Sequence, residues 1–387
     1  MIRFVTFCDE FAEAGSKMMI KEEKKPEEKT QNSEPLIPGL PDEIAEHCLL
    51  HLPYPNQVLV RSVSSSWNRA ITDPSFFLSK KTLFLSLPYI FVFAFHRSTA
   101  KLQWQALDPR SGRWFVLPPM PIMNPVCPAS FACASVPRQG SLFVLGGMRS
   151  DTEASQPTLV TYRAGTNRWS VACPMQYPRS FFAAGSIGGK IFAAGGSGTV
   201  VSETVSTVEC YDPAKDTWMT VAKMRNGLSR YDAAVVGEKM YVTEGWTWPF
   251  SYSPRGGVYN AEKDTWEEMS VGMREGWTGI SVVLGDRLFV ITEHGSCRMK
   301  VYDHEMDTWH YLGGGEFPCE TLKKPFAVCG VEGKIYVVSS GLDVCVGRVF
   351  ERREEKEEEK LWVEWEVMRA PMVFNDFVPS TSQVLYA

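Results

Sequence analysis

Three histidines in the last third of the chain, His294, His304 and His310, carry the side chain that most readily binds a transition metal. Their spacing matches no metal-ligand motif, and a histidine in a turn is more often simply solvated. The chain also lacks the G-x-S-x-G element of serine hydrolases and the glycine-rich loop that holds nucleotide phosphates. We therefore predict no catalytic residue, no metal site and no cofactor.

The composition excludes several other classes of protein. The 10 cysteines include no C-x-x-C pair, which favours reduced and mostly buried thiols. A net charge of -5 gives no reason to expect nucleic acid as a partner. No apolar run approaches the roughly 18 residues of a membrane span, and the first residues lack the layout of a signal peptide. We predict an intracellular protein, in the nucleus or the cytoplasm or both.

Aromatic residues gather in one stretch, Trp246 to Tyr252, that also contains Pro249 and reads as a loop. Aromatic and arginine side chains are favoured anchors of protein interfaces. An alternative is that Trp246 and Trp248 fill the centre of the fold. The candidate residues for recognition of a target protein are Arg179, Arg230, Tyr231, Trp246, Trp248, Tyr252 and Trp277.

These candidates must be positioned by a repeated element, of which Tyr211 to Trp218 is the clearest copy. A tyrosine precedes a tryptophan by seven positions in four copies, and Leu107 precedes Trp114 in a fifth. Before each of the four tyrosines lies an apolar run of strand length that ends in glycine, and successive tryptophans of the five copies are 43 to 55 residues apart. A repeat of four strands and about 50 residues predicts a mainly β propeller.

Six blades account for the repeats. The sixth tryptophan is Trp365, since Met372 follows it at the offset that separates Met273 from Trp266. The charged stretch from Glu351 to Lys360 is predicted to be a solvated loop between the third and fourth strands of this blade. The C-terminal strand, Gln383 to Ala387, is expected to complete blade one and close the ring, with Leu83 to Leu87 as a competing candidate.

The strand order predicts which loops share a face. In an up-and-down blade the loops after the second and the fourth strands lie at the same end. All seven candidate recognition residues fall in such loops. The segment that precedes blade one, and the charged loop, would lie at the opposite end, so that two interaction surfaces would be held apart.

The chain before the propeller divides into two parts. Residues 1–35 contain interleaved lysine and glutamate with proline, which cannot bury enough apolar area to order a chain, so a disordered tail is expected. Residues 36–80 carry helical stripes, one after Pro41 and one at Val58, Leu59, Val63 and Trp67, with Ile71 beyond. Such a short helical module needs a surface to dock on. The propeller is predicted to cover residues 82–387.

The helical module resembles an F-box, on the strength of Leu40-Pro41-Asp42-Glu43-Ile44, Cys48 to Pro53, Arg61 to Trp67 and Ile71 to Phe76. In that family the motif docks on the Skp adaptor of a cullin–RING ubiquitin ligase. Ser65 stands where many F-boxes have Lys or Arg. The residues that the resemblance implies for the adaptor contact are Leu40, Pro41, Ile44, Leu49, Leu52, Val63 and Trp67.

The repeats resemble the kelch family through their Gly-Gly pairs, tyrosine and tryptophan, over about 300 residues. Together the two resemblances imply a non-catalytic substrate receptor of a Skp–cullin–F-box ubiquitin ligase, which binds the adaptor through the F-box and a target protein through the propeller. In several segments, such as Arg113 to Met120 and Glu275 to Gly279, the likeness extends to plant members that act in far-red light signalling. The alternatives are a kelch scaffold that degrades no client and a metal-dependent kelch enzyme.

Overall fold

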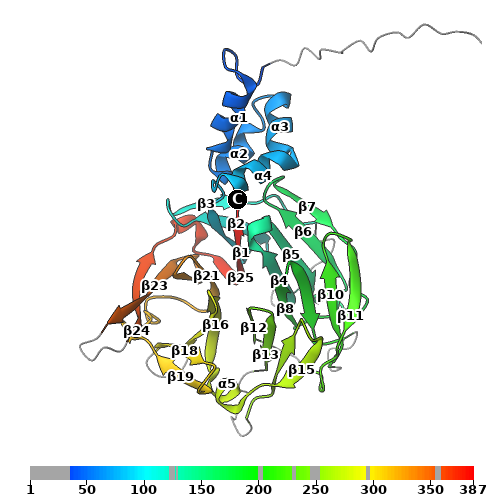
Figure 1. Ribbon diagram of the computed structural model, residues 1–387, viewed down its shortest axis with the longest axis vertical. Helices are drawn as coiled ribbons and strands as arrows, with labels where there is room; N and C mark the ends of the chain where they lie inside the picture. Colours follow the sequence, from blue (N-terminus) through cyan, green and yellow to red (C-terminus); the bar gives the residue numbers. More distant parts are fainter. Residues whose placement is uncertain are drawn as a thin grey trace, which may run out of the picture.

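The computed structural model describes residues 35–121, 127, 130–198, 204–228, 232–244, 253–292, 297–353 and 359–387. Six antiparallel sheets surround a central axis, and a small helical module lies on the rim of the ring (Figure 1). The prediction of a six-bladed propeller preceded by a helical module is confirmed.

The sheets follow one another around the ring in chain order. Their inner strands line a central cavity of about 340 Å³. From the axis outward, blade one contains β25 (Phe377–Tyr386), β1 (Pro88–His96), β2 (Leu102–Asp108) and β3 (Arg113–Val116). Blade two contains β4 (Phe131–Val136), β5 (Ser141–Gly146), β6 (Leu159–Arg163) and β7 (Arg168–Val171). Blade three contains β8 (Ala183–Ile187), β9 (Lys190–Ala194), β10 (Val208–Asp212) and β11 (Thr217–Val221).

The remaining blades repeat this order. Blade four contains β12 (Asp232–Val236), β13 (Lys239–Thr243), β14 (Gly256–Asn260) and β15 (Thr265–Glu268). Blade five contains β16 (Gly279–Leu284), β17 (Arg287–Thr292), β18 (Met299–Asp303) and β19 (Thr308–Tyr311). Blade six contains β21 (Ala327–Val331), β22 (Lys334–Val338), β23 (Val344–Arg353) and β24 (Glu359–Met368). The linkers between blades include α5 (Val271–Gly276), and the short 3-10 helices are η1 (Pro137–Gln139) and η2 (Met372–Phe374).

The two ends of the ring meet in blade one. Strand β25 pairs antiparallel with β1 from Pro88↔Tyr386 to His96↔Phe377, so the C-terminal strand supplies the inner strand of the first blade. Leu87 and Ala387 exchange both backbone hydrogen bonds at the end of this pairing. The competing segment, residues 83–87, forms no strand.

Blade six departs from the prediction at the charged stretch. Strands β23 and β24 are 10 residues each and continue their pairing through Glu351↔Leu361 and Arg352↔Lys360. The expectation of a loop from 351 to 360 is therefore wrong at both ends, because backbone pairing extends a hairpin even where its side chains are charged. A short strand, β20 (Gly313–Gly314), runs parallel to β24 and covers its outer edge.

In blades three, four and five, the repeated tyrosine and tryptophan clamp the blade to the one before it. In blade three, Tyr211 pairs with Trp218 and donates its hydroxyl to the Asp216 carboxylate, at 2.7 Å. The same carboxylate accepts the backbone N–H of Cys173 at 2.9 Å, and the Trp218 indole donates to the Cys173 carbonyl at 2.8 Å. Cys173 lies in the linker after blade two, so these bonds connect neighbouring blades.

Blade four repeats the clamp with Tyr259, Asp264 and Trp266 on the backbone of Ala222. In blade six the Trp365 indole donates to the carbonyl of Gly315, at 3.2 Å, which places it in the same role. Trp365 pairs with Gly347, where the other copies have a tyrosine or leucine, and a Cβ on that glycine would lie 2.5 Å from the indole ring. The sequence assignment of the sixth tryptophan is confirmed.

The clamp of blade five predicts a pH-dependent contribution to stability. Hydrogen bonds from Ser270 and Tyr302, each 2.6 Å, lower the pKa of Asp307 from 3.8 to about 2. The depressed pKa means that the stabilisation is complete above about pH 4 and is lost as the pH falls towards 2. We expect Asp307→Asn to lower the melting temperature by a few degrees at pH 7, and the difference from wild type to shrink towards pH 2.

The matched control is Glu305→Gln in the same turn, where the side chain is exposed. Thermal melts of both variants between pH 2 and 7 test the expectation. A gap between wild type and Asp307→Asn that stays constant over this range would contradict the assignment of the ionised carboxylate as the clamp.

The helical module contains α1 (Asp42–Leu50), α2 (Tyr54–Val60), α3 (Ser65–Thr72) and α4 (Pro74–Thr82). The second predicted stripe, Val58 to Ile71, is divided between α2 and α3, because Ser64 caps α3 by accepting the Trp67 backbone N–H at 3.1 Å. Asp73 caps α4 in the same way through Ser75. Within the described residues, no helix has both the length and the apolar character to cross a membrane.

Candidate interaction surfaces

The helical module separates its apolar residues into a core and an exposed set. Leu49, Leu50, Ile71 and Phe76 form the core. Leu40, Pro41, Ile44 and Val63 are exposed, Ile44 with 53% of its surface accessible. All four belong to the set that the resemblance implies for the adaptor contact.

The three other members of that set, Leu49, Leu52 and Trp67, are buried or half-buried. Leu49 is only 2% exposed, so its side chain supports the core of the module and does not reach an external partner. Leu52 and Trp67 are half-buried against the same core. The inclusion of Leu49 as a contact residue was therefore wrong: α1 has two apolar faces, and its helical period does not say which of them faces inward.

Leu59 was not assigned to the adaptor contact, although it is 68% exposed. It lies on α2 beside Val58, which packs against the ring. The signal available in the sequence was the Val58-Leu59 pair, because adjacent residues on a helix cannot both face the same neighbour.

The segment before α1 is tied to the module by two hydrogen bonds. The Trp67 indole donates to the Leu36 carbonyl at 2.5 Å, and the Leu36 backbone N–H donates to the Asp42 carboxylate at 2.9 Å. These bonds hold Leu40 and Pro41 next to the start of α1. These hydrogen bonds therefore hold the backbone that carries the exposed apolar residues of this segment and of α1.

The module docks on blades one and two through buried contacts. Tyr54 packs against Tyr89 and Phe91, and its hydroxyl is hydrogen-bonded to that of Tyr162. Burial raises the pKa of Tyr54 well above its ordinary value, so the phenol stays neutral. Arg61 donates to the carbonyls of Gly165 and Thr166 at the end of β6.

Phe77 completes the junction between the module and the ring. It lies over Gly140 and Gly165, in the two turns of blade two that face the module, and a Cβ at Gly140 would come within 2.9 Å of its ring. Both glycines thus allow the close approach of α4. The helices α2 and α4 both contact the ring, and these contacts together fix the orientation of the module.

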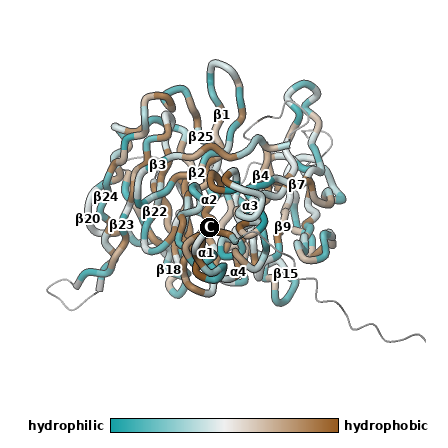
Figure 2. The backbone as a smooth tube through the Cα atoms, turned by 90° about the horizontal axis from the view of Figure 1, so that it is seen from above, coloured by the Kyte–Doolittle hydropathy of each residue, from teal (hydrophilic) through white to brown (hydrophobic). Residues whose placement is uncertain are grey.

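The loops after the second and fourth strands lie together at the other end of the blades. The backbone of Gln156 forms an isolated antiparallel β-bridge with that of Arg179, and the backbone of Ser197 forms such bridges with both Ser180 and Thr204. Strand β1 connects the two ends: Tyr89 contacts the module, and the hairpin after His96 projects at the far end, roughly 25 Å away along nine residues. Figure 2 shows this hairpin on the side of the ring away from α1 and α4.

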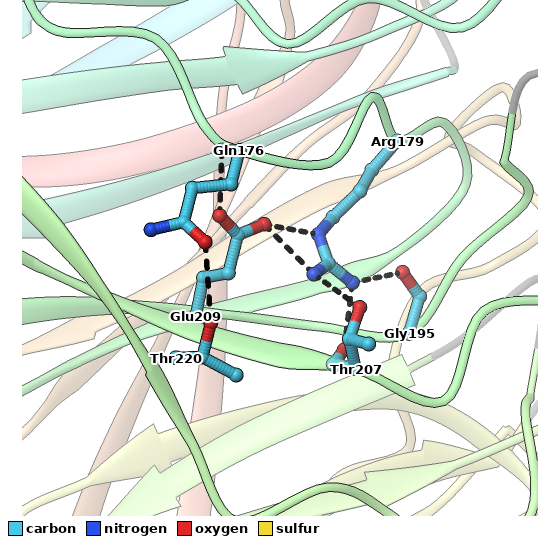
Figure 3. A network of polar contacts seen from close by, with 6 residues as sticks. All are labelled: Gln176, Arg179, Gly195, Thr207, Glu209 and Thr220. Atoms are coloured by element: carbon cyan, nitrogen blue, oxygen red, sulfur yellow. Dashed lines mark hydrogen bonds and ion pairs between the residues drawn. The ribbon is translucent and has the colours of Figure 1, made fainter.

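Arg179 is not part of the loop surface, which corrects its prediction as a recognition residue. Its side chain is 0% exposed and forms an ion pair with Glu209, which is also fully buried. The guanidinium donates to Glu209 at 2.8 and 3.1 Å and to the carbonyls of Gly195 and Thr207 at 2.9 and 2.7 Å (Figure 3). Arg179 therefore joins the linker before blade three to the strands of that blade.

The carboxylate of Glu209 has a further donor. It accepts the backbone N–H of Gln176 at 2.7 Å, and the Gln176 side chain in turn accepts the Thr220 hydroxyl. The only sign of this network in the sequence was a glutamate inside the apolar run Val208 to Tyr211. A charged residue in a buried strand needs an oppositely charged partner, and Arg179 supplies it.

Trp277 is also buried, and its assignment to the recognition surface was wrong. Its ring packs with Met273, Leu288 and Tyr302, and its indole donates to the Asp232 carboxylate at 2.9 Å. Burial raises the pKa of Asp232 above its ordinary value, although hydrogen bonds from Ser281 and Trp277 oppose this. Trp277 therefore stabilises the junction of blades four and five.

The other predicted recognition residues, Arg230, Tyr231, Trp246, Trp248 and Tyr252, lie outside the described residues. The strands that flank the aromatic stretch are well defined. Glu244 and Arg255 pair through their side chains at 2.8 Å and their backbones at 3.1 Å. This ion pair joins the end of β13 to the start of β14.

The histidines do not assemble a metal centre where the structure describes them. His304 packs against Tyr241 and Tyr302, and the exposed His310 lies 3.7 Å from the half-buried Asp303. His294 lies outside the described residues. Within the described ranges, no three side chains of His, Cys, Asp or Glu converge as a metal site.

Comparison with known proteins is consistent with both architectural parts. An F-box domain model matches residues 37–79, and a kelch motif model matches residues 178–225. The F-box protein AFR of Arabidopsis thaliana is 50% identical over 362 residues, which covers 93% of this chain and 95% of that protein. A second F-box/kelch-repeat protein of that plant is 41% identical over 355 residues, with 92% and 87% coverage. The F-box/kelch-repeat protein SKIP30 is 30% identical over 284 residues, with 71% and 75% coverage.

Proposed function

This chain belongs to the F-box/kelch-repeat proteins, and from that premise we propose that it is the substrate-recognition subunit of a Skp–cullin–F-box ubiquitin ligase. The helical module binds the Skp-type adaptor, and the propeller binds a target protein. The chain carries out no bond chemistry itself. It raises the effective concentration of a target lysine near a ubiquitin carrier that the rest of the ligase holds.

The observation that best supports this proposal is the exposed apolar set on the helical module. Leu40, Ile44, Leu59 and Val63 remain in water while the module's other face packs on the ring. A module of about 45 residues rarely exposes several large apolar side chains unless a partner covers them. An adaptor interface accounts for their exposure.

The docking of the module supports the second half of the proposal. Tyr54, Arg61 and Phe77 fix the module against blades one and two, at the end of the blades away from Ser155, Ser197 and Thr204. A target bound on the loop surface would thus be presented at a fixed distance and angle from the adaptor. Arg230, Tyr231, Trp246, Trp248 and Tyr252 remain the proposed contact residues for the target.

Adaptor binding is tested with the double substitution Leu40→Ala/Ile44→Ala. Both side chains are exposed, so the variant is expected to melt at the wild-type temperature while its affinity for a purified Skp-type adaptor falls at least tenfold. Isothermal titration calorimetry on the full chain gives the dissociation constant. The matched control is Val171→Ala, an exposed apolar residue on β7 of the ring, which should bind as wild type does. Equal binding by all three proteins would refute the adaptor assignment.

A kelch scaffold that binds the adaptor without degrading a client is the second candidate. The same exposed apolar set favours it equally, so the two are separated by a client and not by adaptor affinity. Under the receptor proposal, proximity labelling with proteasome inhibition should recover a protein that accumulates when this chain is removed. Adaptor binding without any such client would favour the scaffold.

The cellular setting is a finer part of the proposal. We propose action in the nucleus or cytoplasm of a plant cell and a role in far-red light signalling, on the basis of the likeness to plant F-box/kelch-repeat proteins. Loss of this chain is then expected to change growth under far-red light and to leave growth in darkness unaltered. Equal growth of mutant and wild-type seedlings under far-red light would remove that part of the proposal.

A further inference from the structure

We propose that the helical module binds one divalent metal ion that favours imidazole ligands, such as Zn²⁺, between His47 and His51. The two residues lie four positions apart at the end of α1, and both side chains are exposed. Two histidines at this spacing share one face of a helix and can chelate a metal. The pair is separate from His294, His304 and His310 of the propeller.

The distance between the two imidazoles fits a tetrahedral metal ion. Their Nε2 atoms are 3.4 Å apart. A Zn²⁺ ion binds imidazole nitrogens at about 2.0–2.1 Å in tetrahedral geometry, which places two such nitrogens about 3.3–3.4 Å apart. A good protein hydrogen bond spans only about 2.7–3.2 Å, so a direct bond between the imidazoles is weak. The side chains therefore already have the spacing that a bound ion needs.

The backbone keeps the two imidazoles one helical turn apart. The His51 N–H donates to the His47 carbonyl at 3.4 Å, and His51 itself has right-handed helical dihedral angles, φ -75° and ψ -11°. Between the two histidines, Leu49 and Leu50 are buried in the core of the module. The last turn of α1 is thus anchored, which reduces the entropy lost when an ion joins the two side chains.

The electrostatic surroundings of the pair favour a cation. Helix α1 carries Asp42, Glu43 and Glu46 and contains no lysine or arginine. The pair also lies at the C-terminal end of the helix, where the helix dipole is negative. Within the described residues, no third side chain of His, Cys, Asp or Glu converges on the pair. The remaining coordination positions of the ion are therefore open to water or to a partner.

The site lies beside the surface proposed for the adaptor. Ile44, which is 53% exposed, precedes His47 by three positions and therefore shares its side of α1. A partner that covers Ile44 would thus meet the bound ion at its open positions. The metal site itself does not depend on the receptor role, since two imidazoles chelate an ion without an adaptor.

The test is a calorimetric titration of the full chain with ZnCl₂ at neutral pH. His51→Ala removes one of the two ligands and should weaken the site at least tenfold, because the second imidazole binds an ion that the first already holds. His51 is exposed, so the variant should melt at the wild-type temperature. The matched control is His310→Ala, an exposed histidine on β19 of the ring, which should bind Zn²⁺ as wild type does.

A second variant separates the chelate from the mere presence of histidine. Glu46→His/His47→Ala keeps the number of histidines in the module but places them five positions apart, on different faces of the helix. Its affinity for Zn²⁺ should fall as far as that of His51→Ala. The proposal is overturned if wild type has no Zn²⁺ site that His51→Ala weakens. It is also overturned if the rearranged variant binds Zn²⁺ as tightly as wild type.

Discussion

Removal of residues 380–387 is expected to open the propeller and to lower its melting temperature by more than about 10 °C, or to abolish soluble expression. The deletion takes away the pairing partners of β1 from Pro88 to Phe93. It also removes the buried side chains of Val384 and Leu385, which fill the cores on the two sides of blade one. Burial of such side chains contributes about 1.5–3 kcal/mol each.

The exposed edge would make this loss worse. Residues 89–94 of β1 are all fully buried and apolar, so an unpaired β1 would present a long apolar strand edge to other chains. Thermal melts and size-exclusion chromatography measure both effects. A chain that lacks residues 1–34 is the control for truncation. It should melt at the temperature of the full chain, because the charged composition of the removed residues gives them little apolar area to bury. An unchanged melt after loss of residues 380–387 would disprove closure by β25.

The second large effect is expected at the buried ion pair. Arg179→Ala should reduce the free energy of unfolding by about 3–5 kcal/mol, because it leaves the Glu209 carboxylate buried without its cation. The two side chains are 0% exposed, and among the described residues the carboxylate would keep only the Gln176 N–H as a donor. Urea denaturation followed by tryptophan fluorescence gives the change.

Two further variants separate loss of the pair from loss of volume. Arg179→Met/Glu209→Met removes both charges and should recover most of the stability, since apolar residues of similar size can replace a buried pair. Arg287→Ala is the matched control, because its 3.1 Å pair with Glu351 is about half exposed on both sides and should contribute at most about 1 kcal/mol. Similar losses in Arg179→Ala and Arg287→Ala would show that burial of the pair has no special energetic role.

Arg179 and Trp277 show why the linkers were harder to interpret than the strands. Residues of a strand alternate with a period of two, and those of a helix recur at about 3.6, so each pattern tells which side chains share a face. A linker has no period. Arg179 lies 30 positions before Glu209 and Trp277 lies 45 positions after Asp232, so neither burial could be inferred from neighbouring residues.

The module shows the same limit on a smaller scale. The helical stripe of α1 identified both Ile44 and Leu49 as apolar face residues, yet one is exposed and the other belongs to the core. Which face turns inward depends on where α4 packs, and α4 is in turn positioned by Phe77 on Gly140 and Gly165 of the ring. Within the described residues the Trp104 indole N–H has no hydrogen-bond acceptor, which likewise cannot be inferred from the sequence.

The sequence by itself determined the number of blades and the order of their strands, while the pairing of β25 with β1 decided between the two candidates for closing the ring. The reason is that Tyr211, Trp218 and their counterparts make the same local hairpin and the same clamp in successive copies, so spacing along the chain reports the fold directly. Only the tertiary structure decided which polar and aromatic side chains of the linkers reach the surface. Their burial depends on partners from other blades, and the distance between such partners in the sequence is set by the ring and not by any local pattern.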